Sequence, residues 1–209
     1  MDGTNKETDW HKITQNDEYL QLSINRLNEP ILKWANQISE MLPKKPLTVN
    51  EIGCNVGHFY RAIKDKNMTY KGYDISKTYL DVATKNFGNF FHQLDITKQI
   101  PETADVTVIS ATLEHLENFE DALNNIFLST KKRVILRTFI GFTNKISYFS
   151  KSDSHKPYIV RQFNTKALNP NKLPIKLIKD EATNSKPYKI GNFKRKIQII
   201  DFKLSNIDD

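Results

Sequence analysis

The sequence predicts an α/β fold with a doubly wound, mostly parallel seven-stranded sheet and an antiparallel C-terminal hairpin. Two observations lead to this prediction. Between residues 47 and 139, short apolar segments alternate with segments of helical period, an order typical of parallel strands joined by helices. Two more strand-like segments, separated by a turn signal at 184–187, lie near the C-terminus.

The elements are predicted in the following order. Residues 16–42 are expected to be helical with a fresh start at Pro30, and the prolines at 43 and 46 end this part. Strands are expected at 47–52, 70–75, 89–94, 106–110, 133–139, 174–182 and 196–204, and helices at 57–66, 76–86 and 118–129. Residues 140–171 have no clean period.

Composition and charge limit the class of protein. A chain of 209 residues suffices for one α/β domain, and its single cysteine, Cys54, excludes an internal disulfide; we expect it to be a small residue in a tight turn. No apolar run is long enough to span a bilayer and the polar start lacks the apolar core of a signal peptide, so a cytoplasmic location is expected.

The charge of the chain is unevenly distributed: residues 131–209 hold 18 Lys and Arg against 6 Asp and Glu, whereas residues 1–130 hold 13 against 18. This basic part is either a solvated face or a rim that attracts anions.

The most informative pattern lies at the tips of the first two strands. The first ends in Glu51 and runs into a loop with Gly53 and Gly57, and the second ends in Asp74. This arrangement suits a nucleoside, because the loop backbone approaches the ligand and a strand-tip carboxylate accepts two ribose hydroxyls. The loop is not G-x-G-x-x-G and has no Lys-Ser or Lys-Thr of a phosphate loop.

Residues 51–57 resemble the first motif of class I S-adenosylmethionine-dependent methyltransferases, acid-x-Gly-x-Gly-x-Gly, with Asn55 in place of the middle glycine. Asparagine also adopts a left-handed backbone. Asp74 resembles the ribose-binding acid of that class, and residues 94–96 resemble its third motif. Residues 105–116 resemble the fourth strand and following loop in the form common among small-molecule members, of the type 11/23-like domain.

The resemblance implies a Rossmann-like methyltransferase fold with S-adenosyl-L-methionine as cofactor. Glu51 would engage the loop amides or, through water, the methionine amino group. Asp95 would approach the adenine amino group, or else begin a turn. Ile75 and Ile96 would form apolar walls for the adenine ring. The cofactor-binding residues implied are Glu51, Gly53, Asn55, Gly57, Asp74, Ile75, Asp95, Ile96 and Ser110.

Glu114 and His115 follow the fourth strand and are the expected catalytic residues. Ligands of open parallel sheets lie outside the carboxyl ends of the strands, so His115 would take a proton from an acceptor hydroxyl. The alternative is a histidine that only packs locally. A related family of RNA-end methyltransferases holds a divalent metal with the motif Glu-x-x-Glu-His. In this sequence Ala111 replaces the first glutamate of that motif, so no metal site is expected.

The resulting hypothesis is an O-methyltransferase acting on a small polar acceptor, anionic or sugar-like, such as a phosphorylated or nucleotide-linked sugar held by Arg161. The alternatives are RNA methylation and a non-catalytic, cofactor-binding partner subunit. The chain would comprise an N-terminal helical cap (1–45), a cofactor-binding core (46–139), an insert or lid (140–171) and a C-terminal hairpin (172–209), all in one domain.

Overall fold

A computed structural model describes residues 17–149, 158–183, 188–190 and 193–204. The helices are α2 (Asp17–Leu27), α3 (Lys33–Met41), α4 (Tyr60–Ile63), α5 (Lys77–Phe87) and α6 (Phe119–Leu128), with a 3₁₀ turn, η1 (Leu113–His115). The strands are β1 (Leu47–Ile52), β2 (Met68–Asp74), β3 (Phe91–Gln93), β4 (Ala104–Ser110), β5 (Thr130–Ile140), β6 (Lys145–Phe149), β7 (Tyr158–Gln162), β8 (Ile175–Lys179), β9 (Tyr188–Ile190) and β10 (Phe193–Lys203).

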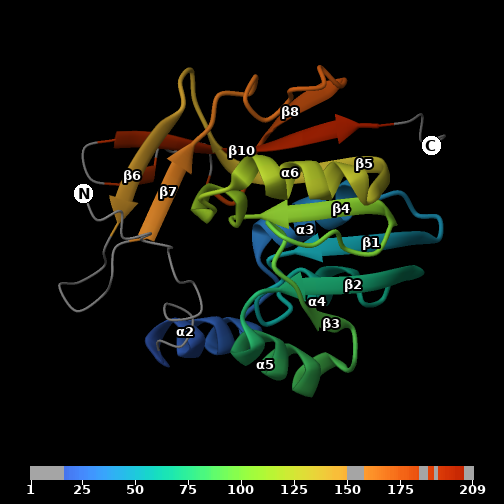
Figure 1. The fold of residues 1–209 in the computed structure, drawn as a ribbon. Helices are drawn as coiled ribbons and strands as arrows, with labels where there is room; N and C mark the ends of the chain where they lie inside the picture. Colours follow the sequence, from blue (N-terminus) through green and yellow to red (C-terminus); the bar gives the residue numbers. More distant parts are fainter. Residues whose placement is uncertain (1–16, 150–157, 184–187, 191–192, 205–209) are drawn as a thin grey trace.

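The main sheet confirms the predicted fold class (Figure 1). Its strand order is β3-β2-β1-β4-β5-β10-β8, and β9 pairs with the first part of β10. Strands β1 to β5 pair in parallel, whereas β10 runs antiparallel to both β5 and β8. The order turns outward in both directions from β1 and β4, which is the doubly wound arrangement in which ligands bind beyond the strand ends.

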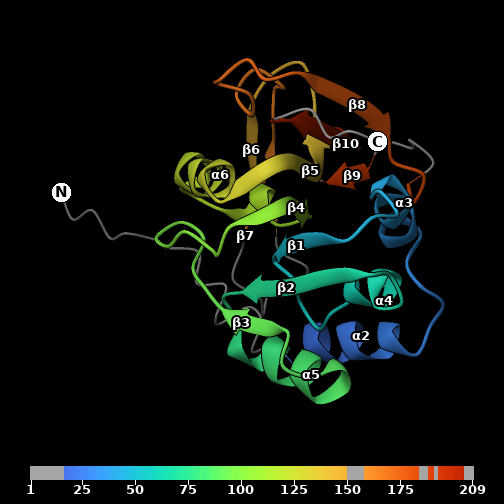
Figure 2. The same ribbon diagram turned by 90° about the vertical axis from the view of Figure 1, so that its right-hand side faces the viewer.

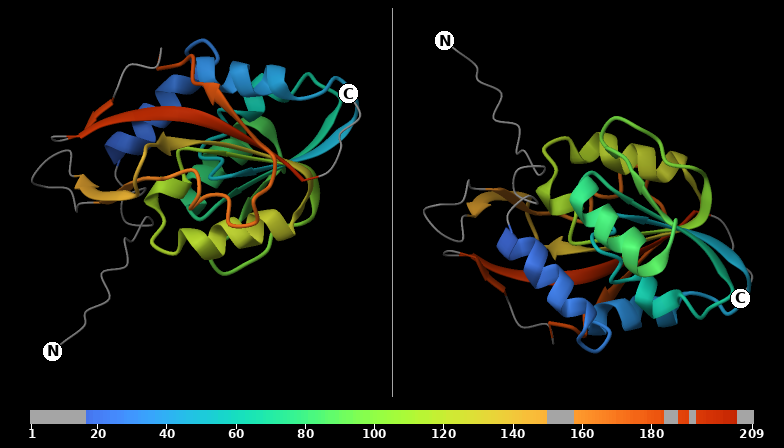
Figure 3. Two further views of the ribbon diagram at one scale, coloured as in Figure 1. Left: turned by 90° about the horizontal axis from the view of Figure 1, so that it is seen from above. Right: turned by 90° about the horizontal axis from the view of Figure 1, so that it is seen from below.

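Helices cover both faces of the sheet, with α6 on one side and α3 on the other (Figure 3). Buried side chains of α3, α4 and α5 share one core with the sheet, including Ile38, Ile63 and Leu80. The second core lies on the other face, where Leu123 and Ile126 of α6 pack with buried residues of β4 and β5. Strands β1 and β4 are buried along almost their whole length, as parallel strands between two helical layers require.

Several predicted elements differ in extent. The expected helix at 57–66 is reduced to one turn, α4, preceded by turns that begin at the glycine loop. The predicted helical region at 16–42 consists of two helices, α2 and α3. They are separated by residues 28–32, which agrees with the interruption that we predicted at Pro30. Part of the segment without a clean period forms an antiparallel hairpin, in which β6 pairs with β7. The predicted turn at 184–187 lies outside the described residues.

Candidate functional site

The loop after β1 has the left-handed backbone that its sequence predicted. Gly53, Asn55 and Gly57 have φ values of 75°, 51° and 91°. The amides of Gly53 and Cys54 donate to the carbonyl of Tyr73 at 2.7 and 3.0 Å, which ties the loop to the end of β2. The prediction that Asn55 replaces a glycine in a left-handed position is therefore confirmed.

Gly53 is required by its protein neighbours as well as by its backbone angle. A Cβ atom there would lie 2.0 Å from Oγ1 of Thr112, in the loop after β4. The space beside the Gly53 Cα is therefore filled by Thr112. Gly57 is similar, because a Cβ there would lie 2.9 Å from the ring of Phe87.

Asp74 closes the loop from the tip of β2. Its two carboxylate oxygens accept hydrogen bonds from the amides of Asn55 and Ser76, both at 2.9 Å, and the residue is 9% exposed. A carboxylate has about four acceptor positions, so these bonds are compatible with contact to ribose hydroxyls. Asp74 therefore holds the loop in the conformation that a bound nucleoside would meet.

Glu51 points into the core instead of toward the loop amides. It is 2% exposed and accepts a hydrogen bond from the hydroxyl of Tyr70. Burial is the main reason that the pKa of Glu51 is raised to about 8. The hydrogen bond from Tyr70 lowers this pKa, and the negative charge of Asp74 raises it. Burial, with Asp74 and Glu51 adding to it, also raises the pKa of the Cys54 thiol. Burial thus favours the protonated form of both groups, and a thiolate role for Cys54 is disfavoured.

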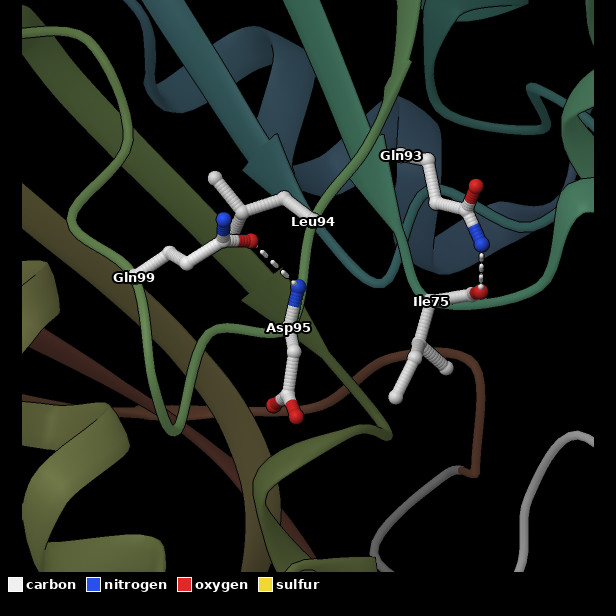
Figure 4. Close-up of a pocket in the computed structure, with 5 residues that line it drawn as sticks. All are labelled: Ile75, Gln93, Leu94, Asp95 and Gln99. Atoms are coloured by element: carbon white, nitrogen blue, oxygen red, sulfur yellow. Dashed lines mark hydrogen bonds between the residues drawn. The ribbon is translucent and has the colours of Figure 1, made fainter.

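An open cavity of about 310 Å³ lies beside the ends of β2 and β3 (Figure 4). Its lining consists of Ile75, Gln93, Leu94, Asp95 and Gln99. The Gln93 side chain donates to the carbonyl of Ile75 at 3.0 Å, and the Asp95 amide donates to the side chain of Gln99 at 3.3 Å. This volume and mixed lining suit a flat, polar-edged ring such as adenine.

Asp95 has contacts that agree with both of its expected roles, the start of a turn and a contact with adenine. Its carboxylate accepts from the amide and hydroxyl of Thr97 at 3.0 and 2.7 Å, which is the turn geometry. Burial raises the pKa of Asp95, but the bonds from Thr97 and Lys98 outweigh burial and leave it below its usual value. Asp95 nevertheless lines the cavity, whereas Ile96 is buried in the core on the α6 side and does not. Of the two expected apolar walls, only Ile75 lines the cavity.

The loop after β4 brings the expected catalytic residues to the same edge of the sheet. Ser110 ends β4, and its buried hydroxyl has no hydrogen-bond partner in the part of the chain that the structure describes. Ala111 follows with φ of 54°, a backbone region that costs non-glycine residues about 1 kcal/mol or more. Strain and an unsatisfied hydroxyl at a strand tip are features of a ligand site.

Glu114 and His115 face different surroundings. Glu114 is 2% exposed and accepts a hydrogen bond from the hydroxyl of Thr138 at 2.9 Å, so its carboxyl group lies inside the domain. His115 is half-buried, and its Nδ1 lies 2.8 Å from the carbonyl of Ile159 in β7. Since a carbonyl only accepts, Nδ1 carries the proton and Nε2 is the basic nitrogen of the neutral ring.

Arg161 fastens the hairpin to this loop and is not placed as an anion clamp. Its Nε donates to the carbonyl of Leu116 at 3.1 Å and its Nη2 to that of Glu117 at 3.0 Å. The guanidinium also lies 5.3 Å from the ring centroid of Phe119. These contacts correct the expectation that Arg161 grips an acceptor, since the planar group is engaged by backbone carbonyls and an aromatic ring.

The charged groups do not form a metal-binding cluster in the described residues, where no three His, Cys, Asp or Glu side chains converge. No helix within those residues is long and apolar enough to cross a membrane. The site is thus a glycine loop, the strand-tip acid Asp74, a cavity lined by Asp95, and a histidine, all at the carboxyl edge of a parallel sheet. Its residues fit S-adenosyl-L-methionine, because the cavity is lined by Ile75, directly after Asp74, the expected ribose acid, and the buried hydroxyl of Ser110 at the tip of β4 has no partner in the described residues.

The family described as "Methyltransferase domain" matches residues 50–136, which run from β1 into β5 and include the glycine loop, Asp74, Asp95, Glu114 and His115. The chain carries a class I S-adenosylmethionine-dependent methyltransferase domain. S-adenosyl-L-methionine is the cofactor of this class. No curated protein matches the sequence.

Solved structures of methyltransferases share the fold of this domain. A TehB-like S-adenosylmethionine-dependent methyltransferase from Corynebacterium glutamicum is 19% identical, with a TM-score of 0.62 over 88% of this chain and 95% of that one. Magnesium protoporphyrin IX methyltransferase from Synechocystis, with bound S-adenosylmethionine, is 17% identical, with a TM-score of 0.57 over 94% and 89%. A possible histamine N-methyltransferase from Thermotoga maritima is 16% identical, with a TM-score of 0.59 over 94% and 98%. At these identities the likeness shows the fold alone, and the two acceptors that these names give, magnesium protoporphyrin IX and histamine, are unlike each other.

Proposed function

We propose that this methyltransferase transfers a methyl group to an oxygen atom of a small polar acceptor, with His115 as the general base. The observation that carries this proposal is the hydrogen bond between Nδ1 of His115 and the carbonyl of Ile159, which makes Nε2 the proton-accepting nitrogen. Bound S-adenosyl-L-methionine supplies an electrophilic methyl group on a sulfonium sulfur.

The chain's own residues would divide the remaining work between binding and proton transfer. Asp74 would accept the ribose hydroxyls, and the cavity at Ile75 and Asp95 would take the adenine ring. His115 Nε2 would accept the acceptor's hydroxyl proton as the new carbon–oxygen bond forms. The hairpin of β6 and β7, fastened by Arg161, would help to exclude water from the reacting groups.

The acceptor class is proposed as a hydroxyl-bearing small molecule, and sugars with a phosphate or nucleotide remain within it. The basic composition of residues 131–209 supports an anionic acceptor, but Arg161 does not, because its contacts are internal. RNA would use several phosphate contacts at once, and we therefore treat it as an outcome of the test rather than as a second proposal.

The test combines cofactor binding with methyl transfer. Calorimetry with S-adenosylhomocysteine should show binding to the wild type, and a labelled-methyl assay should identify the acceptor from a panel of neutral sugars, phosphorylated and nucleotide-linked sugars, and RNA. His115→Ala should lower turnover by about 10²–10⁴-fold with cofactor affinity unchanged. The matched control is His92→Ala, which removes an exposed histidine on β3.

Each result separates one alternative. Binding without transfer to any acceptor would indicate a non-catalytic partner subunit. Full turnover in His115→Ala would show that alignment alone drives the reaction and that no base is used. Failure of the wild type to bind either form of the cofactor would refute the proposal as a whole.

A further inference from the structure

Helix α2 packs against the domain less deeply than the other long helices. Among its residues with described side chains, Ser23 alone is buried, at 7% exposed, whereas Leu22 is 37% exposed. No residue of α2 belongs to either core cluster. A surface helix usually buries a continuous apolar stripe, whereas the stripe of α2, formed by Leu20, Ile24 and Leu27, is only partly buried, so the helix is held less firmly than the core helices.

The buried Ser23 meets Tyr79 of α5, and Figures 1 and 2 show the two helices side by side. Tyr79 is 6% exposed, and its hydroxyl interacts with the side chains of Ser23 and Asn55 and with the charge of Asp74. Burial raises the pKa of Tyr79 to about 12, Asp74 adds to this, and the hydrogen-bonding groups of Ser23 and Asn55 oppose it. One hydroxyl thus joins α2 to the left-handed residue of the cofactor loop and to the ribose acid.

The other end of α2 is held at a pivot. Arg61 of α4 donates from Nη1 to the carbonyl of Arg26 at 3.1 Å and from Nη2 to that of Glu29 at 2.9 Å. These bonds satisfy carbonyls at the end of the helix, directly before the turn at Pro30. Movement about this pivot would separate Ser23 from Tyr79 while leaving the end of α2 in place.

A buried histidine near the pivot disfavours a permanently closed arrangement. His58 is 8% exposed, and neither ring nitrogen has a hydrogen-bond partner in the described part of the chain. Burial lowers the pKa of His58 to about 4, and the nearby charges of Arg26 in α2 and Arg61 in α4 lower it further. A buried polar group without a partner costs free energy that opening to water would recover.

We propose that α2 is a cover over the ribose end of the cofactor site and that Tyr79 is the positioning residue that couples its closure to bound cofactor. The proposal rests on the proposed function, since it requires the ribose at Asp74. Asp74 is 9% exposed, and Tyr79, which lies near it and meets α2 through Ser23, is 6% exposed, so in the proposal the cofactor enters with α2 open. Closure through Ser23, Tyr79 and Asn55 would then slow cofactor dissociation.

The test measures α2 and the cofactor in the same samples. Hydrogen exchange of residues 17–27 should slow roughly 3- to 10-fold when S-adenosylhomocysteine is bound to the wild type. In Tyr79→Phe this protection should disappear, and the dissociation rate of S-adenosylhomocysteine in stopped flow should rise roughly 3- to 10-fold, as expected for one or two lost hydrogen bonds. The melting temperature without ligand should stay close to that of the wild type.

The matched control is Tyr60→Phe, which removes the hydroxyl of a tyrosine in the aromatic cluster of Tyr70, Phe87 and Phe91. This variant should keep both the protection of α2 and the wild-type dissociation rate. If the wild type binds S-adenosylhomocysteine but α2 exchanges equally fast with and without it, the cover is refuted and the proposed function stands. If Tyr79→Phe dissociates at the wild-type rate, Tyr79 is not the coupling residue. Absence of binding in the wild type would overturn both proposals.

Discussion

The glycine at the start of the cofactor loop has two separate reasons to be glycine, and they can be measured apart. Gly53 and Gly88 both have left-handed φ values, of 75° and 97°. A Cβ at Gly53 would lie 2.0 Å from Thr112 Oγ1, whereas at Gly88 the nearest atom is 3.4 Å away, on the flexible side chain of Phe90. Both sites therefore have an unfavourable backbone angle for an L-residue, and they differ in the contact that a side chain would make.

We therefore predict that Gly53→Ala destabilises the domain by well over about 3 kcal/mol, and that Gly88→Ala, at φ of 97° and ψ of −170°, costs only the roughly 1–3 kcal/mol of an unfavourable backbone region. Urea denaturation of both variants checks this. Thr112→Gly in the Gly53→Ala background should recover the contact part and leave the backbone part. Equal losses at the two glycines would contradict the close approach of the β4 loop.

The buried acid of β1 predicts a specific dependence of stability on pH. Glu51 has a pKa of about 8 in the folded state and 4.5 as its ordinary value, with burial as the main cause. Between these values the unfolded chain binds fewer protons than the folded one, so this group makes the free energy of unfolding fall as pH rises, by up to about 1.4 kcal/mol per unit.

Glu51→Gln should thus gain stability relative to the wild type as pH rises from 4.5 to 8, with the gain absent at the acidic end. The amide still offers an acceptor to Tyr70 and does not ionise. Thermal or urea unfolding across this pH range measures the difference, and Glu40→Gln, at an exposed position of α3, is the control. A difference that stays constant with pH would show that Glu51 is ionised in the fold.

At the scale of single residues, the sequence predicted where a residue lies in the fold better than which side chain it contacts. The left-handed Asn55 and the strand-tip Asp74 follow from local rules for loops and parallel sheets, and both were predicted correctly. The partner of Glu51 depends on a neighbouring strand: a Cβ at Gly72 would lie 2.6 Å from the Tyr70 hydroxyl, so the missing side chain makes room for that bond. Such a contact has no local signal in the sequence.

Between elements, a buried ion pair holds β5 to the segment after β8. Nε and Nη2 of Arg137 each lie 3.1 Å from a carboxylate oxygen of Asp180, and the two side chains are 9% and 0% exposed. Trp34 of α3 lies beneath the guanidinium, 5.7 Å from it. The cluster therefore joins three elements that are distant in the sequence.

Removing one partner should be far worse than removing both. Asp180→Ala should cost about 3–5 kcal/mol, because it leaves the Arg137 charge buried and unpaired, while Arg137→Met with Asp180→Leu should recover much of this loss. Chemical denaturation provides the measurement. The control is Asp81→Ala, which breaks the exposed pair with Lys77 and should cost less than about 1 kcal/mol. A double variant as unstable as Asp180→Ala would mean that shape, and not charge, dominates the site.

The hairpin of β6 and β7 is the element that the sequence did not predict, and burial explains why. Ile159 and Val160 are consecutive and both buried, at 3% and 2% exposed, so β7 shows no alternation of apolar and polar residues. Its position depends on contacts with residues some 45 positions away, from Arg161 to Leu116 and from His115 to Ile159. The central strands, by contrast, were predictable because each is an apolar run between two helices.

Over the whole molecule, the uneven charge is partly neutralised inside the fold. Arg133 and Arg137 pair with Asp201 and Asp180, and Lys132 pairs with Asp105. Strand β8, with Lys176 and Lys179, lies at the edge of the sheet opposite β3 and hence opposite the cavity. The composition alone suggested a basic rim around the acceptor, but much of that charge lies away from the site or is already paired.

This distribution gives the last prediction, which concerns salt. A small acceptor meets few of these cations, so kcat/KM for it should change by less than about tenfold between 50 and 200 mM salt. An RNA acceptor that used 6–10 phosphate contacts would lose roughly 10³–10⁵ in affinity over the same range. Lys176→Gln with Lys179→Gln on β8 should leave the reaction of a small acceptor unchanged. A steep salt dependence that these two substitutions reduce would place a nucleic acid across the far edge of the sheet and contradict the small-molecule assignment.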